Sequence, residues 1–303
     1  MSPSPGILAL ALTRSVYHNQ PIAARIPEDL VEAVATILIK NRMHIAAYRF
    51  LESAQESQEC YFERALEFSV KRDLKLAEYR NELAAIVAKT LDGAGIPYVI
   101  FKTFNPSQAV GVDIDVLIPR RNFYDAVKVL LRRGFSLIDD LKKSYATGLI
   151  IAGNPVIVDL HTDLTVGGVS YLRPRMMFCH VTELELKTHA ESVPVSIPDA
   201  GMEVIVRILH TFVKEAELTL SDIYDVMELL RRQEKPDTYN ILREPELKSV
   251  KELIALGIRT YALLLNDPVY LRALNEERSD SWRFLEGEIH KKVLGGIFPA
   301  RLG

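Results

Sequence analysis

The spacing of apolar residues along this chain changes twice. From residue 27 to about residue 94 the apolar positions recur at helical spacing, with a break at residues 53–57, which predicts two long helices. In the middle of the chain the apolar runs become short and rich in Val and Ile, as is typical of strands. Strands are predicted at residues 98–102, 112–118, 135–138, 146–152, 156–161, 181–186 and 193–197. Helical spacing then returns, and helices are predicted at residues 203–214, 220–231, 246–265 and 282–294.

These elements predict an α+β fold. An amphipathic helix at residues 120–133 links two strands, and the pair Gly153-Asn154 marks a hairpin turn, so the strands are expected to form a small mixed sheet. The predicted parts are an N-terminal helical region at residues 1–94, a mixed-sheet domain at 95–198 and a C-terminal helical domain at 199–303. The apolar run at residues 6–12 is expected to belong to a packed helix, because a membrane span needs about 20 residues.

Two aspartates in the strand at residues 112–118 are the main candidates for chemistry. Side chains alternate between the two faces of a strand, so Asp113 and Asp115 project from one face while the β-branched residues between them point the other way. In a later apolar strand, Asp159 shares a face with His161 for the same reason. If the two strands are neighbours, three carboxylates converge, and the expected ligand is a hard divalent cation, Mg²⁺ or Mn²⁺.

The order of these motifs resembles the nucleotidyltransferase superfamily that includes DNA polymerase β and aminoglycoside nucleotidyltransferases. It is most similar to uncharacterised nucleotidyltransferase-like proteins, whose pattern runs Leu-Lys-Gly, Asp-Ile-Asp-Leu-Leu-Val, Gly-aromatic and Val-Asp-Leu-His. The corresponding residues here are Phe101-Lys102-Thr103, Asp113-Ile114-Asp115-Val116-Leu117-Ile118, Gly134-Phe135 and Val158-Asp159-Leu160-His161. The resemblance spans residues 96–163, with weaker similarity to about residue 230. It implies a nucleotidyltransferase-like mixed sheet with flanking helices.

The resemblance also implies a metal-dependent transfer of a nucleoside monophosphate from a nucleoside triphosphate to an acceptor hydroxyl. The catalytic residues and metal ligands would be Asp113, Asp115 and Asp159, with Mg²⁺ or Mn²⁺ as cofactor and with Asp159 also helping to deprotonate the acceptor. Lys102 and Thr103 would contact the triphosphate. Three roles are open for His161: a neighbour of the metal, a donor that orients a carboxylate through a hydrogen bond, and a hydrogen-bonded residue at a strand end. The orienting or structural role is favoured, because Mg²⁺ prefers oxygen ligands. The acceptor would be a protein, an RNA or a small molecule.

One stretch departs from the superfamily pattern. Most members have Gly-Gly or Gly-Ser after the first strand, where backbone N–H groups approach the triphosphate closely. This chain has Lys102-Thr103-Phe104-Asn105-Pro106 in that place. The alternative hypothesis is therefore a catalytically inactive nucleotide-binding or scaffold protein that retains the fold.

Composition narrows the choice of partners. The formal net charge of −3 gives no overall attraction for nucleic acid, so an RNA partner requires a local basic patch. The basic pairs Arg120-Arg121, Arg132-Arg133 and Lys142-Lys143 are typical of a solvated helix face, with a nucleotide or RNA patch as the alternative. The two cysteines form neither a disulfide framework nor a zinc signature, so we expect a cytoplasmic protein without a membrane partner.

Three further polar residues are expected to have structural roles. His210 lies on an apolar helix, which is typical of a histidine in the core or at its boundary. Asp222 and Asp225 lie near a predicted helix start, where carboxylates commonly cap the helix and favour its dipole.

Overall fold

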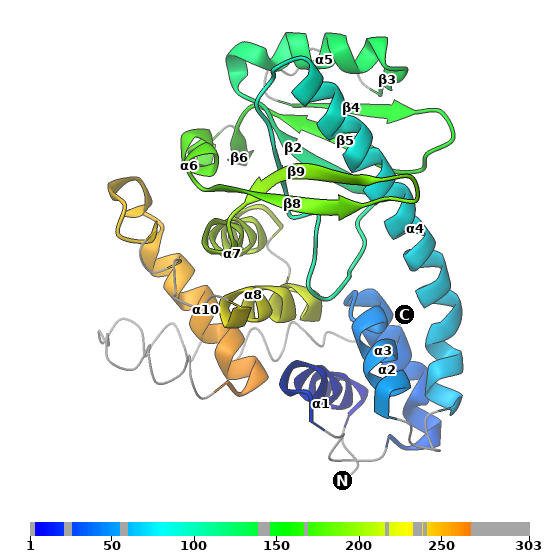
Figure 1. Cartoon of the computed structure of the whole chain (residues 1–303). Helices are drawn as coiled ribbons and strands as arrows, with labels where there is room; N and C mark the ends of the chain where they lie inside the picture. Colours follow the sequence, from blue (N-terminus) through cyan, green and yellow to red (C-terminus); the bar gives the residue numbers. More distant parts are fainter. Residues whose placement is uncertain are drawn as a thin grey trace.

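The computed structural model is built around a five-stranded mixed sheet, with helices on both of its faces (Figure 1). The residues it describes are 4–20, 26–54, 60–138, 146–166, 169–215, 218–232, 238 and 241–267. The predicted helix at 282–294 and the basic pair Lys142-Lys143 lie outside the described residues.

The strand order of the sheet is β1-β2-β5-β4-β3. These strands are β1 (Val99–Phe101), β2 (Asp113–Leu117), β3 (Phe135–Leu137), β4 (Ala146–Ile151) and β5 (Ile157–His161). Only β2 and β5 are paired in parallel, and the other neighbours in this sheet are antiparallel. The chain turns from β4 into β5 at Gly153, whose φ of +83° suits glycine, and the predicted α+β fold with a mixed sheet is confirmed. The predicted hairpin is present, but it lies inside the sheet rather than at an edge, because β5 pairs with β2 and β4 pairs with β3.

The two faces of the sheet belong to different cores. On one face, alternate apolar residues such as Ile114, Val116 and Val158 pack against α4 (Cys60–Gly93) and α5 (Phe123–Arg132). On the other face, Val99, Phe101 and Leu117 join the core of the C-terminal helices. The strands therefore read as nearly continuous apolar runs, because they are covered on both sides.

The helical elements follow the predicted order. Before the sheet lie α1 (Pro5–His18), a 3-10 turn (Glu28–Leu30), α2 (Val31–Lys40), α3 (His44–Ala54) and α4. After it lie the hairpin β6 (Leu164–Val166) and β7 (Val169–Leu172), the short α6 (Pro174–Cys179) and the hairpin β8 (Val181–Lys187) and β9 (Ser192–Pro198). The last elements of the described chain are α7 (Ala200–Leu209), a π-helical turn (His210–Glu215), α8 (Leu220–Arg232), a 3-10 turn (Pro245–Leu247) and α10 (Lys251–Leu265). A further 3-10 turn (Arg120–Asn122) precedes α5.

One predicted helix is divided in two. The sequence predicts a single helix up to the break at residues 53–57, but the structure ends α2 at Lys40 and starts α3 at His44. Arg42, between them, has a φ of +57°, which lies in the left-handed region and cannot continue a right-handed helix. The side chain and carbonyl of Asn41 accept hydrogen bonds from the start of α8, so a tertiary contact holds this break.

The first and last described helices pack together. The hydroxyl of Tyr17 in α1 donates to Asp267 at 2.7 Å, and Arg14 donates to the carbonyl of Leu264 at 2.7 Å. Apolar residues of α1, α2, α7, α8 and α10 form one buried cluster. Helices from both ends of the described chain therefore form one core, and this core packs against one face of the sheet. The division of the chain into three domains stays a prediction.

Candidate functional site

Asp115 and Asp159 are direct neighbours on the two parallel strands. In the register of β2 and β5, Asp115 is paired with Asp159, and Asp113 is paired with Ile157. Paired residues of adjacent strands point to the same face, so the three carboxylates share one face of the sheet. This face looks toward the C-terminal helices, because Leu117, the next residue in the alternation, packs in their core.

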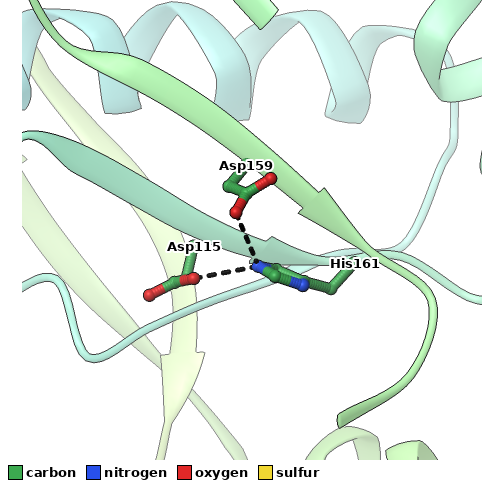
Figure 2. Close-up of side chains that lie close together, drawn as sticks. All are labelled: Asp115, Asp159 and His161. Carbon is green, nitrogen blue, oxygen red and sulfur yellow. Dashed lines mark hydrogen bonds and ion pairs between the residues drawn. The ribbon is translucent and has the colours of Figure 1, made fainter. Parts of the chain in front are cut away.

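His161 completes the group, as Figure 2 shows. Its Nε2 lies 2.9 Å from Oδ1 of Asp115 and 3.5 Å from Oδ2 of Asp159. The ligand atoms of these three residues lie within 4.8 Å of one another, and the described part of the chain holds no other such group of histidine, cysteine or carboxylate side chains. Asp113, exposed at the first position of β2, is outside this group.

Lys102 contacts the other oxygen of Asp115. Its Nζ lies 3.0 Å from Oδ2, and the two side chains are only 13% and 12% exposed. Burial opposes the charge of Asp115, but the attraction of Lys102 and the hydrogen bond from His161 outweigh burial and hold the pKa of Asp115 far below its usual range. The hydroxyl of Thr103 donates to the carbonyl of Phe101 at 3.1 Å. Asp115 is therefore an anion across the physiological pH range, with its two oxygens facing different partners.

The pKa values of the other two carboxylates move in the opposite direction. Asp113 is exposed as a residue, but partial desolvation of its carboxyl beside the cleft, together with repulsion from Asp115, raises its pKa. Burial also raises the pKa of Asp159, although the nearby His161 partly offsets it. Carboxylates that resist ionisation beside one another are stabilised by a cation between them, so the group has the electrostatics of a cation site.

A cleft of about 310 Å³ lies beside this group, and Asp113 and Asp115 are part of its lining. Its walls come from the loop that joins β1 to β2, from the segment between α7 and α8, and from the turn between α2 and α3. The charged lining residues are Arg42, Lys102, Arg207, Lys214, Asp113, Asp115, Glu215, Asp222 and Asp225. The volume is within the range of small-molecule sites, and the mixture of charges suits a polar ligand.

A family model described as uncharacterised nucleotidyltransferase matches residues 27–266. The chain belongs to this family. The match includes Lys102, Thr103, the three aspartates and His161. No curated protein sequence matches the chain significantly.

Three solved structures resemble this family member. The first is an antigenic nucleotidyltransferase-like protein from Paracoccidioides brasiliensis, with 16% identity, coverage of 67% of this chain and 94% of that chain, and a TM-score of 0.44. The second is the lincosamide antibiotic adenylyltransferase LnuA with bound lincomycin, with 14% identity, coverage of 46% of this chain and 89% of that chain, and a TM-score of 0.31. The third is the antibiotic-resistance factor ANT(2'')-Ia, with 12% identity, coverage of 69% of this chain and 96% of that chain, and a TM-score of 0.34.

In this nucleotidyltransferase family member, a buried ionic network holds the loop between β1 and β2. Glu203 of α7 accepts the backbone N–H of Lys102 at 3.0 Å, and Asp225 of α8 accepts the backbone N–H of Ser107 at 2.6 Å. Arg207 joins the two carboxylates, with Nη2 2.7 Å from Glu203 and Nη1 3.4 Å from Asp225. Lys102 has a φ of +54°, which is costly for a residue with a side chain, and the bond to Glu203 holds it there.

The sequence reasoning missed this network. Asp225 was expected to cap a helix, but its side chain contacts Arg207 and the loop between β1 and β2 instead. It is 2% exposed, and this burial raises its pKa to about 6. Asp222 does act as a cap, because it accepts the backbone N–H of Thr219 at 2.9 Å. A signal was present: Glu203 and Arg207 are four residues apart in an otherwise apolar helix, and charges in such a place are usually paired.

Arg42 reaches the cleft from the N-terminal helices. The break between α2 and α3 carries it there, and its positive charge counteracts the rise in the pKa of Asp113. The backbone N–H of Leu220 donates to Oδ1 of Asn41 and that of Ser221 to its carbonyl, both at 3.2 Å, so the turn is fixed to α8. Nothing in the local sequence pattern connected this residue with the aspartates.

His210 also lines the cleft, at the first position of the π-helical turn. Burial, with the nearby positive charges of Lys102 and Lys214, lowers its pKa to about 3. The prediction of a core or boundary histidine agrees with this burial, and the structure adds that one edge of the ring meets the cleft. His210 is therefore neutral at physiological pH.

The donor set fits a divalent cation. The carboxylates of Asp115 and Asp159 supply hard oxygen ligands of the kind that Mg²⁺ and Mn²⁺ take, and the imidazole of His161 adds a nitrogen. Asp113 lies on the same face of the sheet but outside this group. Among the described residues, no helix has both the length and the apolar character that crossing a membrane requires.

Proposed function

We propose that this protein is a metal-dependent nucleotidyltransferase, which moves a nucleoside monophosphate from a nucleoside triphosphate to an acceptor hydroxyl. The observation that carries the proposal is the pairing of Asp115 with Asp159 across two parallel strands, with Asp113 on the same face and a cleft lined by Asp113 and Asp115. Family membership supports the reaction class.

In the proposed reaction, the acceptor hydroxyl oxygen attacks the α-phosphorus and the bond from the α-phosphorus to the oxygen of the β-phosphate breaks. Asp113, Asp115 and Asp159 would hold Mg²⁺ or Mn²⁺, which when bound neutralises charge on the phosphates and supports the leaving group. Asp159, which is 37% exposed and has a raised pKa, accepts the proton of the acceptor hydroxyl. The products are the nucleotidylated acceptor and pyrophosphate.

Side chains supply the proposed contacts to the triphosphate. The backbone N–H groups of Lys102 and Ser107 already donate to Glu203 and Asp225, so they are not available to phosphate oxygens. Lys102 and Arg42, which both line the cleft, would provide positive charge in place of a glycine-rich turn. The hydroxyl of Thr103 would donate to a phosphate oxygen in place of the carbonyl of Phe101, its acceptor in this structure. The acceptor in this proposal is a protein, an RNA or a small molecule.

The second candidate is a nucleotide-binding or scaffold protein without transferase activity. The engaged backbone of the loop after β1 favours it, because glycine-rich turns in this place present free N–H groups to the triphosphate. This candidate predicts metal-dependent triphosphate binding with no transfer to any acceptor.

The experiment incubates the purified protein with each labelled nucleoside triphosphate and Mg²⁺ or Mn²⁺, in the presence of total RNA, protein extract or a panel of hydroxyl-bearing small molecules. Label transfer is measured for the native protein and for Asp115→Asn and Asp159→Asn. The matched control is Asp163→Asn, because the Asp163 carboxylate accepts the backbone N–H of Leu164 and the hydroxyl of Ser170 in the β6–β7 region.

We expect transfer by the native protein and by the control, and a loss of more than about 100-fold in the two variants, because metal ions supply several kcal/mol of charge stabilisation. Calorimetric titration with the triphosphate then separates the candidates. Binding without transfer supports the inactive protein, and equal transfer by the native protein and Asp115→Asn refutes the catalytic proposal.

A further inference from the structure

We propose that His161 binds the metal ion directly through Nε2, so that the site is a mixed nitrogen and oxygen site that prefers Mn²⁺ to Mg²⁺. The inference rests on the proposed function, because it concerns the same metal site. It departs from the expectation, drawn from the sequence, that His161 only orients a carboxylate.

The separations of the ligand atoms carry the first step. Ligands bound to one ion at about 2.0–2.2 Å are separated from their nearest neighbours by about 3 Å. Nε2 of His161 lies 2.9 Å from Oδ1 of Asp115 and 3.5 Å from Oδ2 of Asp159. Both separations are close to this value, and the ligand atoms of the three residues all lie within 4.8 Å of one another, so the geometry is compatible with binding to a single ion.

The fold holds these atoms in place. Asp115 and Asp159 are paired in the register of β2 and β5, and His161 lies two residues beyond Asp159 on the same strand and face. The imidazole is 14% exposed and packs edge-on against Phe101, with ring centroids 5.8 Å apart. A histidine confined in this way is a preorganised ligand rather than a flexible surface group.

The contact between Lys102 and Asp115 leaves room for the ion. Lys102 contacts Oδ2 of Asp115, whereas His161 contacts Oδ1, so each oxygen of this carboxylate has a different partner. An ion that binds Oδ1, Asp159 and His161 therefore leaves the ion pair of Lys102 intact. Nε2 carries the proton of the hydrogen bond to Asp115 when no ion is bound, so metal binding replaces that proton, and the imidazole ligates as the neutral tautomer with its proton on Nδ1.

The nitrogen ligand sets the metal preference. Mg²⁺ prefers oxygen ligands and keeps several waters, whereas imidazole suits the first-row transition ions. Mn²⁺ accepts both carboxylate oxygen and imidazole nitrogen, so it matches a site made from Asp115, Asp159 and His161. A site of aspartates alone has no such reason to discriminate against Mg²⁺.

The test uses Mn²⁺ as the probe, without nucleotide or acceptor. The free Mn²⁺ signal in electron paramagnetic resonance gives the dissociation constant, competition with Mg²⁺ gives the preference, and electron spin-echo modulation reports a nitrogen nucleus bound to Mn²⁺. The variant is His161→Asn, which removes the imidazole nitrogen Nε2 and keeps a smaller polar side chain. The control is His210→Asn, which changes a histidine that lines the cleft beside Asp115 but lies outside the group of ligand atoms.

We expect Mn²⁺ to bind at least about tenfold more tightly than Mg²⁺, with nitrogen modulation in the native protein and in the control. His161→Asn should lose the modulation and most of the preference. Bound Mn²⁺ without nitrogen modulation, modulation that survives His161→Asn, or no Mn²⁺ binding overturns the inference. The measurement on the native protein tests nitrogen ligation by itself, so the inference can be overturned even if the variant fails to fold.

The outcomes also separate this inference from the proposed function. Nitrogen-bound Mn²⁺ without nucleotidyl transfer keeps the assignment of His161 and removes the catalytic proposal. Transfer with Mg²⁺ or Mn²⁺ in a protein that shows no nitrogen modulation keeps the catalytic proposal and removes the assignment.

Discussion

Replacing Arg207 with Leu should loosen the loop that carries Lys102, and the structure allows the size of the effect to be worked out. The guanidinium of Arg207, 7% exposed, donates to Glu203 at 2.8 Å and to Asn105 at 2.6 Å, and contacts Asp225 at 3.4 Å. Its removal leaves two carboxylates buried, each with only a loop N–H group as the described partner that remains.

Breaking a buried ion pair by removing one partner costs about 3–5 kcal/mol, because the remaining charge is left uncompensated. We therefore expect Arg207→Leu to lower the free energy of unfolding by about 3–5 kcal/mol, a large part of the stability of an ordinary domain. Arg207→Lys should cost less, because it keeps the charge but loses the fork of donors. Urea unfolding followed by circular dichroism measures both.

Hydrogen exchange links this loss of stability to the site. The backbone amides of Lys102 and Ser107 should exchange faster in Arg207→Leu, because their acceptors Glu203 and Asp225 lose the group that positions them. The control is Lys71→Ala, which removes an exposed helical ion pair with Glu67 and should change neither measurement. Unfolding within about 0.5 kcal/mol of the native value, with unchanged exchange at both amides, refutes the role of the network.

Two further predictions concern packing and pH. A methyl group added at Gly257 of α10 would lie 2.6 Å from Ile208, so Gly257→Ala should lower the free energy of unfolding by about 1–3 kcal/mol. The control is Gly93→Ala, which should not lower it, because a methyl group there meets nothing within 4 Å. Equal stability of the two variants contradicts the prediction. His210, with its pKa lowered to about 3, stays neutral in the folded protein while the unfolded chain binds its proton below about pH 6.5, so stability falls as the pH decreases. The contribution lost between pH 6.5 and pH 5 is about 2 kcal/mol, measured as the difference in pH slope between the native protein and His210→Gln, and identical slopes contradict it.

The local pattern was sufficient for most elements of the fold. The alternation of apolar residues around Asp113 and Asp115 predicts a strand with both carboxylates on one face, and the pair Gly153-Asn154 predicts a hairpin; the structure has both. The period of apolar residues also locates α5 and α8 within a few residues. These features depend on side chains close together in sequence, so the sequence alone determines them.

The break at Arg42 and the network of Glu203, Arg207 and Asp225 could not be predicted in the same way. A left-handed Arg42 is held by hydrogen bonds from α8 to Asn41, and the network joins a loop to two helices far along the chain. The apolar pattern around residue 42 is that of a continuous helix, and only the tertiary contact overrides it.

The sequence by itself determined which residues of each strand share a face, the α+β class and the resemblance to nucleotidyltransferases. Only the tertiary structure decided that Asp115 is paired with Asp159, that Nε2 of His161 faces both, and that Arg42 and the C-terminal helices line the cleft. The physical reason is that strand register and helix docking are set by burial of side chains from distant segments, which no local period encodes.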